Sequence, residues 1–168
     1  VASLEWARRF FAPLPGGWEA VLAKLWPGPL SVVWRARAAA PPALVAPDGT
    51  IGLRVPLLPL AAGWFADVLA TARVPLPTTS VNRSGEAPAV DFAGARTRFG
   101  EAAVYYPAWT PAVAGEARPS TVIRLAADGS YTVLRPGALS IRALERWAPG
   151  AVKGRRATSG GSRLGVTN

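Results

Sequence analysis

Apolar residues recur at helical spacing in three parts of the chain. The first part, residues 17–26, is an amphipathic helix that Pro27 ends, because proline lacks the amide hydrogen that a helix interior needs. The same spacing predicts a helix over residues 60–71 and a final helix that Ser140 caps and that runs through Trp147. The residues expected to face inward are Trp18, Val21, Leu22, Leu25, Leu60, Trp64, Val68, Leu69, Ile141 and Leu144.

Short apolar runs bounded by turn residues predict strands between these helices. The runs are residues 30–34, 51–55, 75–79, 104–106, 121–125 and 131–134. Asp128-Gly129 separates the last two runs, which is typical of a hairpin, and residues 86–100 are a mixed loop and helix region. Helices mixed with strands at this spacing predict an α/β or α+β domain with a mixed sheet. The domain is expected to span residues 1–148, and residues 149–168, rich in Gly, Ser, Thr and Arg, to form a flexible basic tail.

The composition of the chain excludes several classes of catalytic and metal-binding site. The chain has 168 residues and a formal net charge of +9, from 19 Lys and Arg against 10 Asp and Glu. It contains no Cys and no His, which excludes thiolate or imidazole metal sites, cysteine nucleophiles and Ser-His-Asp triads. A basic domain favours anionic partners such as nucleotide, pyrophosphate or RNA, although a basic surface with a basic tail explains the charge equally well. No apolar run reaches the length of a membrane span, and the expected location is the cytoplasm.

The most distinctive polar segment is Pro77 to Gly85, which reads Pro-Thr-Thr-Ser-Val-Asn-Arg-Ser-Gly. It combines hydroxyls, a carboxamide and a terminal glycine at the predicted end of a strand, and this combination suits a small anionic or nucleotide ligand. Because Ser80 and Asn82 alternate along an extended segment, both side chains are expected to face the same ligand. The P-loop pattern and a strand-borne Gly-x-Gly-x-x-Gly pattern are both absent, so a nucleotide site in this chain is of another kind.

Four further segments carry polar groups at turns or strand ends. Residues 26–31 form a rigid turn, Trp-Pro-Gly-Pro-Leu-Ser. Residues 50–56 place a hydroxyl and a guanidinium on one face of a strand, because strand side chains alternate. Residues 119–123 begin a strand with a hydroxyl pair, and residues 134–137 end a strand with an arginine before a turn. Taken singly, each segment also fits a structural role as a turn, a surface arginine or a loop cap.

Taken in order, the five segments resemble the motifs of the YrdC/Sua5 family, the threonylcarbamoyl-adenylate synthases. The family motifs run Trp-Pro-Gly-Pro-Leu-Thr, Arg-Val-Pro, Thr-Ser-Ala-Asn-x-Ser-Gly, Pro-Ser-Thr-Val-Val and Leu-Arg-Pro-Gly. The match extends from the first helix to Leu139, with Ser31 for the usual Thr, Val81 for the usual Ala, and Leu57-Leu58 where a polar residue and His are common. The resemblance implies a twisted mixed sheet with flanking helices around a basic concave cavity. It also implies that L-threonine, bicarbonate and ATP give threonylcarbamoyl-adenylate and pyrophosphate, for the t6A modification of tRNA.

Matching positions carry the family's binding residues over to this chain. The resemblance implies that ATP contacts Thr50, Asn82, Val90 and Arg135, with Val90 acting through its backbone or its shape. It implies that L-threonine or its carbamate contacts Arg54, Ser80 and Ser120. The planar guanidinium of Arg54 suits a carboxylate. No residue is assigned as a general base or a metal ligand, so catalysis is expected to rest on alignment of the carbamate against the α-phosphate, with Mg²⁺ bridging the phosphates of ATP.

The family's first segment is not found between Val1 and Pro15. That segment is a Pro-Thr-Glu-Thr-x-Tyr-Gly-like motif followed by a Lys-x-Arg motif. The domain is therefore expected to lack one strand, to leave a sheet edge unpaired, to bind ATP weakly and to have little or no synthase activity alone. The alternatives are a non-catalytic module that binds tRNA or double-stranded RNA, and a carbamoyl-adenylate domain like that of hydrogenase-maturation carbamoyltransferases. Proteins of the t6A pathway are candidate partners.

Overall fold

The computed structural model describes residues 1–58, 63–72, 74–78, 86, 89, 92–100, 118–148 and 155–156. The chain forms two compact units, of which the first consists of residues 1–57 and 119–168 and the second of residues 58–118. In the described part of the chain, no helix is long and apolar enough to cross a membrane.

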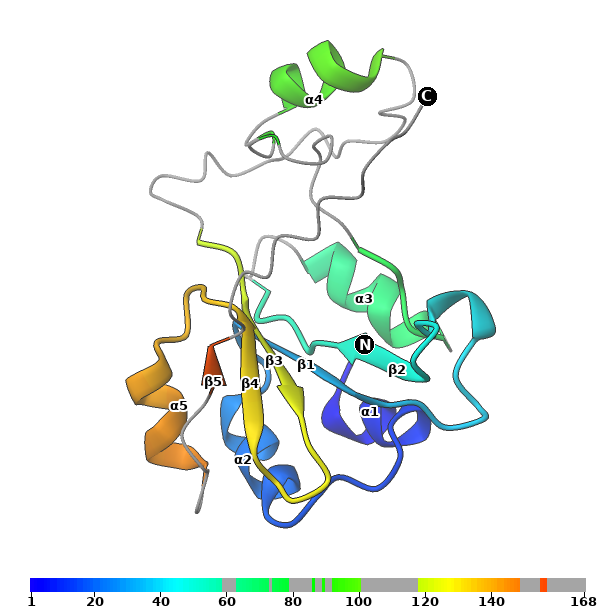
Figure 1. Ribbon diagram of the computed structural model, residues 1–168. Coiled ribbons are helices and arrows are strands. Elements are labelled where there is room, and N and C mark those ends of the chain that lie inside the picture. Colours follow the sequence, from blue (N-terminus) through cyan, green and yellow to red (C-terminus); the bar gives the residue numbers. More distant parts are fainter. Residues whose placement is uncertain are drawn as a thin grey trace, which may run out of the picture. The chain divides into compact units, whose positions relative to one another are not determined.

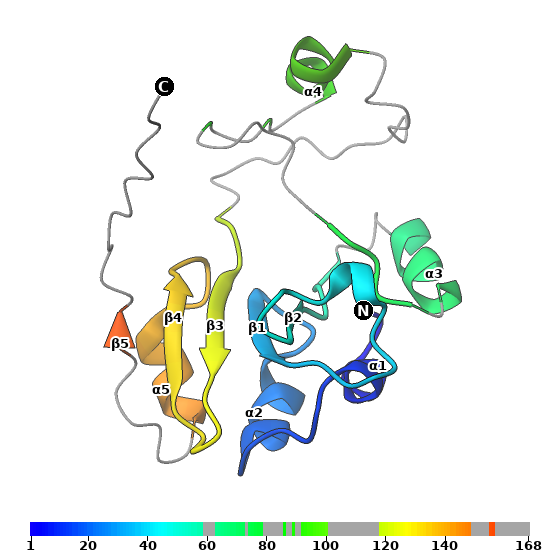
Figure 2. The same cartoon turned by 45° about the vertical axis from the view of Figure 1, so that its right-hand side comes forward.

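The first unit is built on a mixed sheet of five strands. They are β1 (Leu30–Arg35), β2 (Thr50–Leu53), β3 (Thr121–Leu125), β4 (Tyr131–Arg135) and β5 (Arg155–Arg156), and they lie in the order β2-β1-β3-β4-β5 (Figure 1). β1 pairs parallel with β3 and antiparallel with β2, while β4 pairs antiparallel with β3 and parallel with β5 (Figure 2). The mixed sheet and its flanking helices confirm the predicted α/β class.

Three helices pack against one face of this sheet: α1 (Leu4–Phe10), α2 (Trp18–Leu25) and α5 (Ile141–Trp147). Alternate strand positions turn toward them, because successive side chains of a strand point to opposite faces. In β1 the buried positions are Leu30, Val32 and Trp34. Leu22 of α2 and Leu144 of α5 are fully buried in the same cluster, as their spacing predicted.

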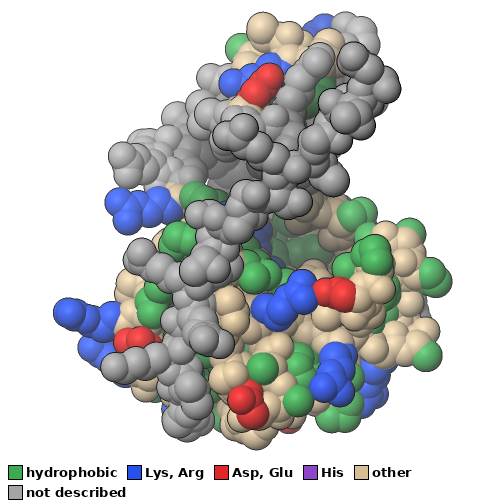
Figure 3. Space-filling model, viewed as in Figure 1, with side chains coloured by type: hydrophobic (Ala, Val, Ile, Leu, Met, Phe, Trp, Pro, Cys, Tyr) green, Lys and Arg blue, Asp and Glu red, His purple; other side chains and the backbone are tan. Residues whose placement is uncertain are grey.

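The opposite side of the sheet, which we call the second face, carries half-buried or exposed side chains. Its residues include Ser31, Val33, Gly52, Val122, Arg124 and Thr132. In the view of Figure 3, basic side chains of the described residues are interspersed with hydrophobic and acidic ones. The basic concave cavity that the resemblance implies stays a prediction.

Side-chain caps begin two of the helices. Ser140 Oγ accepts a hydrogen bond from the backbone N–H of Ala143 at 3.1 Å, which confirms the predicted cap of α5. Ser3 Oγ caps α1 in the same way, by accepting from the backbone N–H of Trp6 at 3.2 Å. The sequence-based prediction did not include α1, which has the same length as α5, and its Ser3 cap was the signal that could have identified it.

Several strand predictions need correction. β2 covers Thr50–Leu53 rather than residues 51–55, because the backbone C=O of Val55 accepts from Gly28 instead of continuing the β1 ladder. Residues 75–78 do not form the predicted strand, since Pro75 and Pro77 have no N–H to donate to a ladder. β5 brings two residues of the predicted tail into the sheet. The predicted strand at residues 104–106 lies outside the described residues.

The second unit contains two described helices, α3 (Gly63–Thr71) and α4 (Phe92–Phe99). α3 confirms most of the helix predicted over residues 60–71, and α4 lies in the predicted mixed region. Leu69 is buried as expected, whereas Val68 is exposed and its predicted inward position is wrong. Periodicity identifies a helix, but the neighbour against which the helix packs decides which stripe turns inward.

Candidate functional site

Strand direction brings four of the five polar segments to one end of the sheet. β1 and β3 run parallel and therefore begin at the same end, while β2 and β4 run antiparallel to them and end there. Ser31 lies at the start of β1 and Ser120 precedes β3. Arg54 follows β2, and Arg135 ends β4. We call this place, where segments far apart in the sequence meet, the motif end of the sheet.

Backbone hydrogen bonds tie these segments together. The N–H of Gly28 donates to the C=O of Val55 at 2.9 Å, and the N–H of Thr121 donates to the C=O of Pro29 at 2.9 Å. The N–H of Ala138 donates to the C=O of Pro119 at 2.8 Å. The turn at residues 26–31 is thus bonded to the segments on both sides of it, so its prolines and glycine fix the spacing of the motif end.

Two glycines allow backbone segments at the motif end to lie close to one another. A Cβ placed on Gly28 would lie 2.2 Å from the backbone oxygen of Leu25. A Cβ placed on Gly137 would lie 2.2 Å from the backbone oxygen of Pro119 and 2.6 Å from the backbone nitrogen of Thr121. Real Cβ atoms do not approach backbone atoms so closely, so the Arg-Pro-Gly turn needs glycine to lie against the Ser-Thr segment.

A hydrogen-bonded cluster of three side chains lies at the motif end. The hydroxyl oxygens of Ser31 and Ser120 are 2.9 Å apart. One Nη atom of Arg135 donates to the backbone oxygen of Ser120 at 3.0 Å and to its hydroxyl oxygen at 3.3 Å. Ser120 is only 6% exposed. The structure therefore joins Ser120 and Arg135, which the family resemblance assigns to two different ligands.

A β-bulge aims Arg135 at this cluster. Ile123 pairs with Val133, but its neighbour Val122 pairs with Arg135, so Leu134 is an extra residue in β4. In a regular ladder Arg135 would share the buried face of Val133, because side chains two residues apart point the same way. The bulge instead sets Arg135 opposite Val122 on the second face, within reach of Ser120.

Arg54 brings a second guanidinium to the same place. Burial, and then the positive charge of Arg135, lower the pKa of Arg54 from its ordinary value. Among the described residues, no carboxylate forms an ion pair with Arg54 or Arg135. Two positive charges near each other, with no carboxylate of the described residues paired to either, repel each other, and an anion bound beside them relieves that repulsion. The motif end is therefore suited to an anionic ligand.

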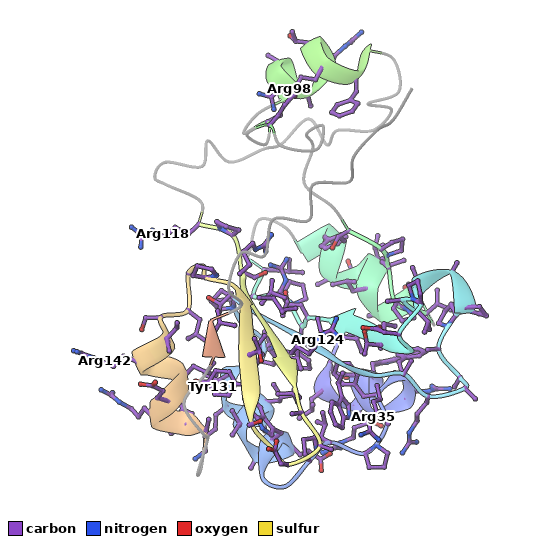
Figure 4. All side chains as sticks on the ribbon, in the orientation of Figure 1. Arg35, Arg98, Arg118, Arg124, Tyr131 and Arg142 are labelled. Carbon is purple, nitrogen blue, oxygen red and sulfur yellow. The ribbon has the colours of Figure 1, made fainter. Side chains whose placement is uncertain are left out.

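Thr50 lies at the opposite end of β2. It pairs with Arg35, at the far end of β1, and its hydroxyl donates to one carboxylate oxygen of Asp48 at 2.6 Å. The other carboxylate oxygen of Asp48 accepts from Arg124 at 2.7 Å, and Figure 4 shows Arg124 projecting from β3. These contacts give Thr50 a structural role in the turn before β2. Its predicted contact with ATP stays a prediction.

The Asp48 cluster makes a pH-dependent contribution to stability. The hydrogen bond from the Thr50 hydroxyl, and then that from Arg124, lower the pKa of Asp48 below its ordinary value of about 3.9. A lowered folded-state pKa means that the carboxylate stabilises the fold above about pH 4, and that this contribution is lost as the pH falls through the folded-state pKa. We expect Asp48→Asn to lower the thermal midpoint at about pH 7, with the gap to the wild type narrowing as the pH is lowered stepwise below about pH 4. A gap that stays the same size throughout this acid titration would contradict this role.

The remaining predicted site residues, Ser80, Asn82 and Val90, lie outside the described residues. Their roles stay predictions. Two contributors to the motif end were missing from the sequence-based assignment. Ser31 had no role there, although its position in the turn motif was a signal, and Gly137 was taken only as part of a turn.

Comparison with known proteins places the chain beside a family of synthases. The family model Sua5_yciO_yrdC, described as telomere recombination, matches residues 1–137. A threonylcarbamoyl-AMP synthase of Halorhodospira halophila is 32% identical over 123 residues, and one of Chromohalobacter salexigens is 36% identical over 104 residues. These alignments cover 73% and 62% of this chain. They cover 61% and 52% of the two relatives, so the chain spans less than two thirds of their length.

Two solved structures have the same fold. P. abyssi Sua5 complexed with L-threonine aligns with a TM-score of 0.69 at 20% identity, over 89% of this chain and 42% of that chain. A variant of P. abyssi Sua5 aligns with a TM-score of 0.70 at 23% identity, over 93% of this chain and 42% of that chain. This likeness confirms the predicted YrdC-like fold.

Proposed function

The chain belongs to the Sua5/YrdC family, and from that premise we propose that its motif end serves the formation of threonylcarbamoyl-adenylate and pyrophosphate from L-threonine, bicarbonate and ATP. The observation that carries the proposal is the hydrogen-bonded cluster of Ser31, Ser120 and Arg135. Arg54 follows β2 at the same end of the sheet, and the charge of Arg135 contributes to its lowered pKa. The curated relatives, which are named as threonylcarbamoyl-AMP synthases, support the same reaction.

The side chains at the motif end match the chemical groups of the substrates that the reaction brings together. Arg54 is positioned to bind the carboxylate of L-threonine, because a guanidinium offers paired N–H donors to two carboxylate oxygens. Ser120 then faces the carbamate that bicarbonate and the threonine amine form with loss of water. Arg135 donates a hydrogen bond to Ser120, and in the proposal it stabilises the negative charge that develops on the α-phosphate.

The reaction needs alignment more than acid–base chemistry. A carbamate oxygen attacks the α-phosphorus of ATP, a new P–O bond forms, and the bond to the leaving pyrophosphate breaks. Holding the two reacting groups in line lowers the barrier by removing the entropy cost of their encounter. In the described part of the chain, no group of three or more acidic or metal-binding side chains is placed to hold a metal ion. In the proposal Mg²⁺ arrives as part of the ATP substrate, where it offsets phosphate charge.

A non-catalytic RNA-binding module is the second candidate, and the net charge of +9 favours it. On this alternative the basic residues neutralise phosphates of tRNA, and binding falls steeply with salt because counterions are released. Binding of this kind needs no recognition of L-threonine.

Ligand titrations separate the two candidates. We expect the protein to bind L-threonine in a saturable way that depends only weakly on salt. Threonine-dependent exchange between ATP and pyrophosphate is the readout of the reaction itself. Salt-sensitive binding of tRNA without any response to L-threonine would overturn the synthase proposal and support the RNA-binding module.

A further inference from the structure

We propose that Ser31 is a positioning residue that directs the hydroxyl of Ser120 toward an anionic oxygen of the ligand. The inference rests on the proposed function, since it concerns the same cluster. Ser31 lies on the second face near the start of β1, and its register partner across the parallel pair is Val122 of β3. The bond from Thr121 N–H to Pro29 C=O fixes the two segments against each other, so the 2.9 Å contact between Ser31 and Ser120 is held by the sheet.

A count of donors and acceptors shows what Ser31 contributes. A serine hydroxyl has one hydrogen to donate and two lone pairs, whereas a guanidinium only donates. Arg135 therefore occupies one lone pair of Ser120 Oγ. One hydrogen bridges the two serine oxygens, which leaves a single hydroxyl hydrogen of the pair without an acceptor among the described residues. The cluster thus presents donors to a ligand.

The charge of the ligand determines which of the two serines donates its hydroxyl hydrogen to the ligand. Donation from the charged Arg135 polarises the Ser120 hydroxyl and makes it the stronger donor of the pair. An anionic oxygen is a stronger acceptor than a neutral serine hydroxyl. When an anion is bound, Ser120 therefore donates to it and Ser31 donates to the second lone pair of Ser120. With both lone pairs occupied, the hydrogen of Ser120 has one direction left, which is toward the ligand.

The hydrogen bond between Ser120 and Arg135 also indicates where the two substrates meet. Ser120 was assigned to L-threonine or its carbamate and Arg135 to ATP, yet the two side chains share a hydrogen bond. The carbamate and the phosphate are therefore adjacent at this bond. Ser31 acts through Ser120 on that junction and does not itself touch the reacting atoms.

The inference is tested with Ser31→Ala, Ser31→Thr and Ser120→Ala, each titrated with L-threonine and, separately, with inorganic pyrophosphate. Loss of one hydrogen bond predicts that Ser31→Ala weakens binding by about threefold to tenfold. Ser120→Ala, which removes the donor itself, is expected to weaken binding by at least about tenfold. Ser31→Thr keeps the hydroxyl and is expected to restore affinity to within about twofold of the wild type. Thr132→Ala removes a hydroxyl from the same face away from the cluster and serves as the control, with equal thermal midpoints confirming folding.

Three results of these titrations would each overturn the role of Ser31. They are an unchanged affinity of Ser31→Ala, an affinity of Ser31→Thr that is not restored, and a larger loss of affinity for Ser31→Ala than for Ser120→Ala. If the wild type binds pyrophosphate but not L-threonine, the proposed function fails, while Ser31 is still judged by the pyrophosphate titrations. If the wild type binds neither probe, both fail together.

Discussion

Arg54→Ala is expected to weaken binding of L-threonine by about 10-fold to 100-fold while the protein stays folded. The guanidinium is partly desolvated next to the positive charge of Arg135, and no carboxylate of the described residues pairs with it. The guanidinium of Arg54 is therefore available to pair with the carboxylate of an anionic ligand. Removing the guanidinium removes charge-assisted hydrogen bonds to the ligand carboxylate, which are among the stronger polar interactions in proteins.

Two matched variants make the Arg54 measurement specific. Arg142→Ala removes the same charge from α5, where Figure 4 shows Arg142 pointing away from the sheet, and it is expected to bind L-threonine like the wild type. Arg54→Lys keeps the charge but loses the planar fork, so an intermediate affinity is expected. Calorimetric titration measures all three, and equal affinities for Arg54→Ala and Arg142→Ala would show that Arg54 does not hold the carboxylate.

Gly137→Ala is expected to destabilise the fold by about 3 kcal/mol or more, or to prevent folding. The added methyl group would lie 2.2 Å from the oxygen of Pro119 and 2.5 Å from the carbonyl carbon of Ser120. Both are backbone atoms, so no side chain is able to rotate away, and the turn after β4 must separate from the segment before β3. Because Ser120 is in that segment, a folded variant is also expected to bind L-threonine less well.

Gly16→Ala is the control for this substitution. Apart from Gly16 itself and its two chain neighbours, no residue has an atom within 4 Å of a Cβ placed on Gly16, so its effect on stability is expected to stay within about 1 kcal/mol. Urea unfolding of the two variants and the wild type gives the comparison. A Gly137→Ala protein as stable as the wild type would refute the close approach of the two motifs.

Much of the first unit could be predicted from local sequence signals. The α2 periodicity, the Ser140 cap and the Asp128-Gly129 hairpin each depend on a few neighbouring residues, and the structure contains all three. β5 had no comparable signal, because a strand of two residues is defined by the neighbour with which it pairs. Of the strand predicted over residues 75–79, the described residues 75–78 do not form a strand, because two prolines outweigh the apolar run.

The sequence motifs named three residues that the structure brings to one end of the sheet, but they did not specify the contacts of these residues. The motif order brought Arg54, Ser120 and Arg135 into one hypothesis, and strand direction explains why they meet. The bulge at Leu134 depends on the register between β3 and β4, which the sequence pattern does not specify. The contact between Ser31 and Ser120 depends on a different register, that between β1 and β3, and the two residues are 89 positions apart in the sequence.

On the proposed function, the motif end of the sheet binds the carboxylate of L-threonine. Calorimetric titration of the unmodified protein with L-threonine and, separately, with L-threoninol tests it most directly, because threoninol keeps the amine and the hydroxyl but has an alcohol in place of the carboxylate. We expect saturable binding of L-threonine and at least about tenfold weaker binding of L-threoninol. No binding of L-threonine by the folded protein, or equal affinity for the two compounds, would contradict the account.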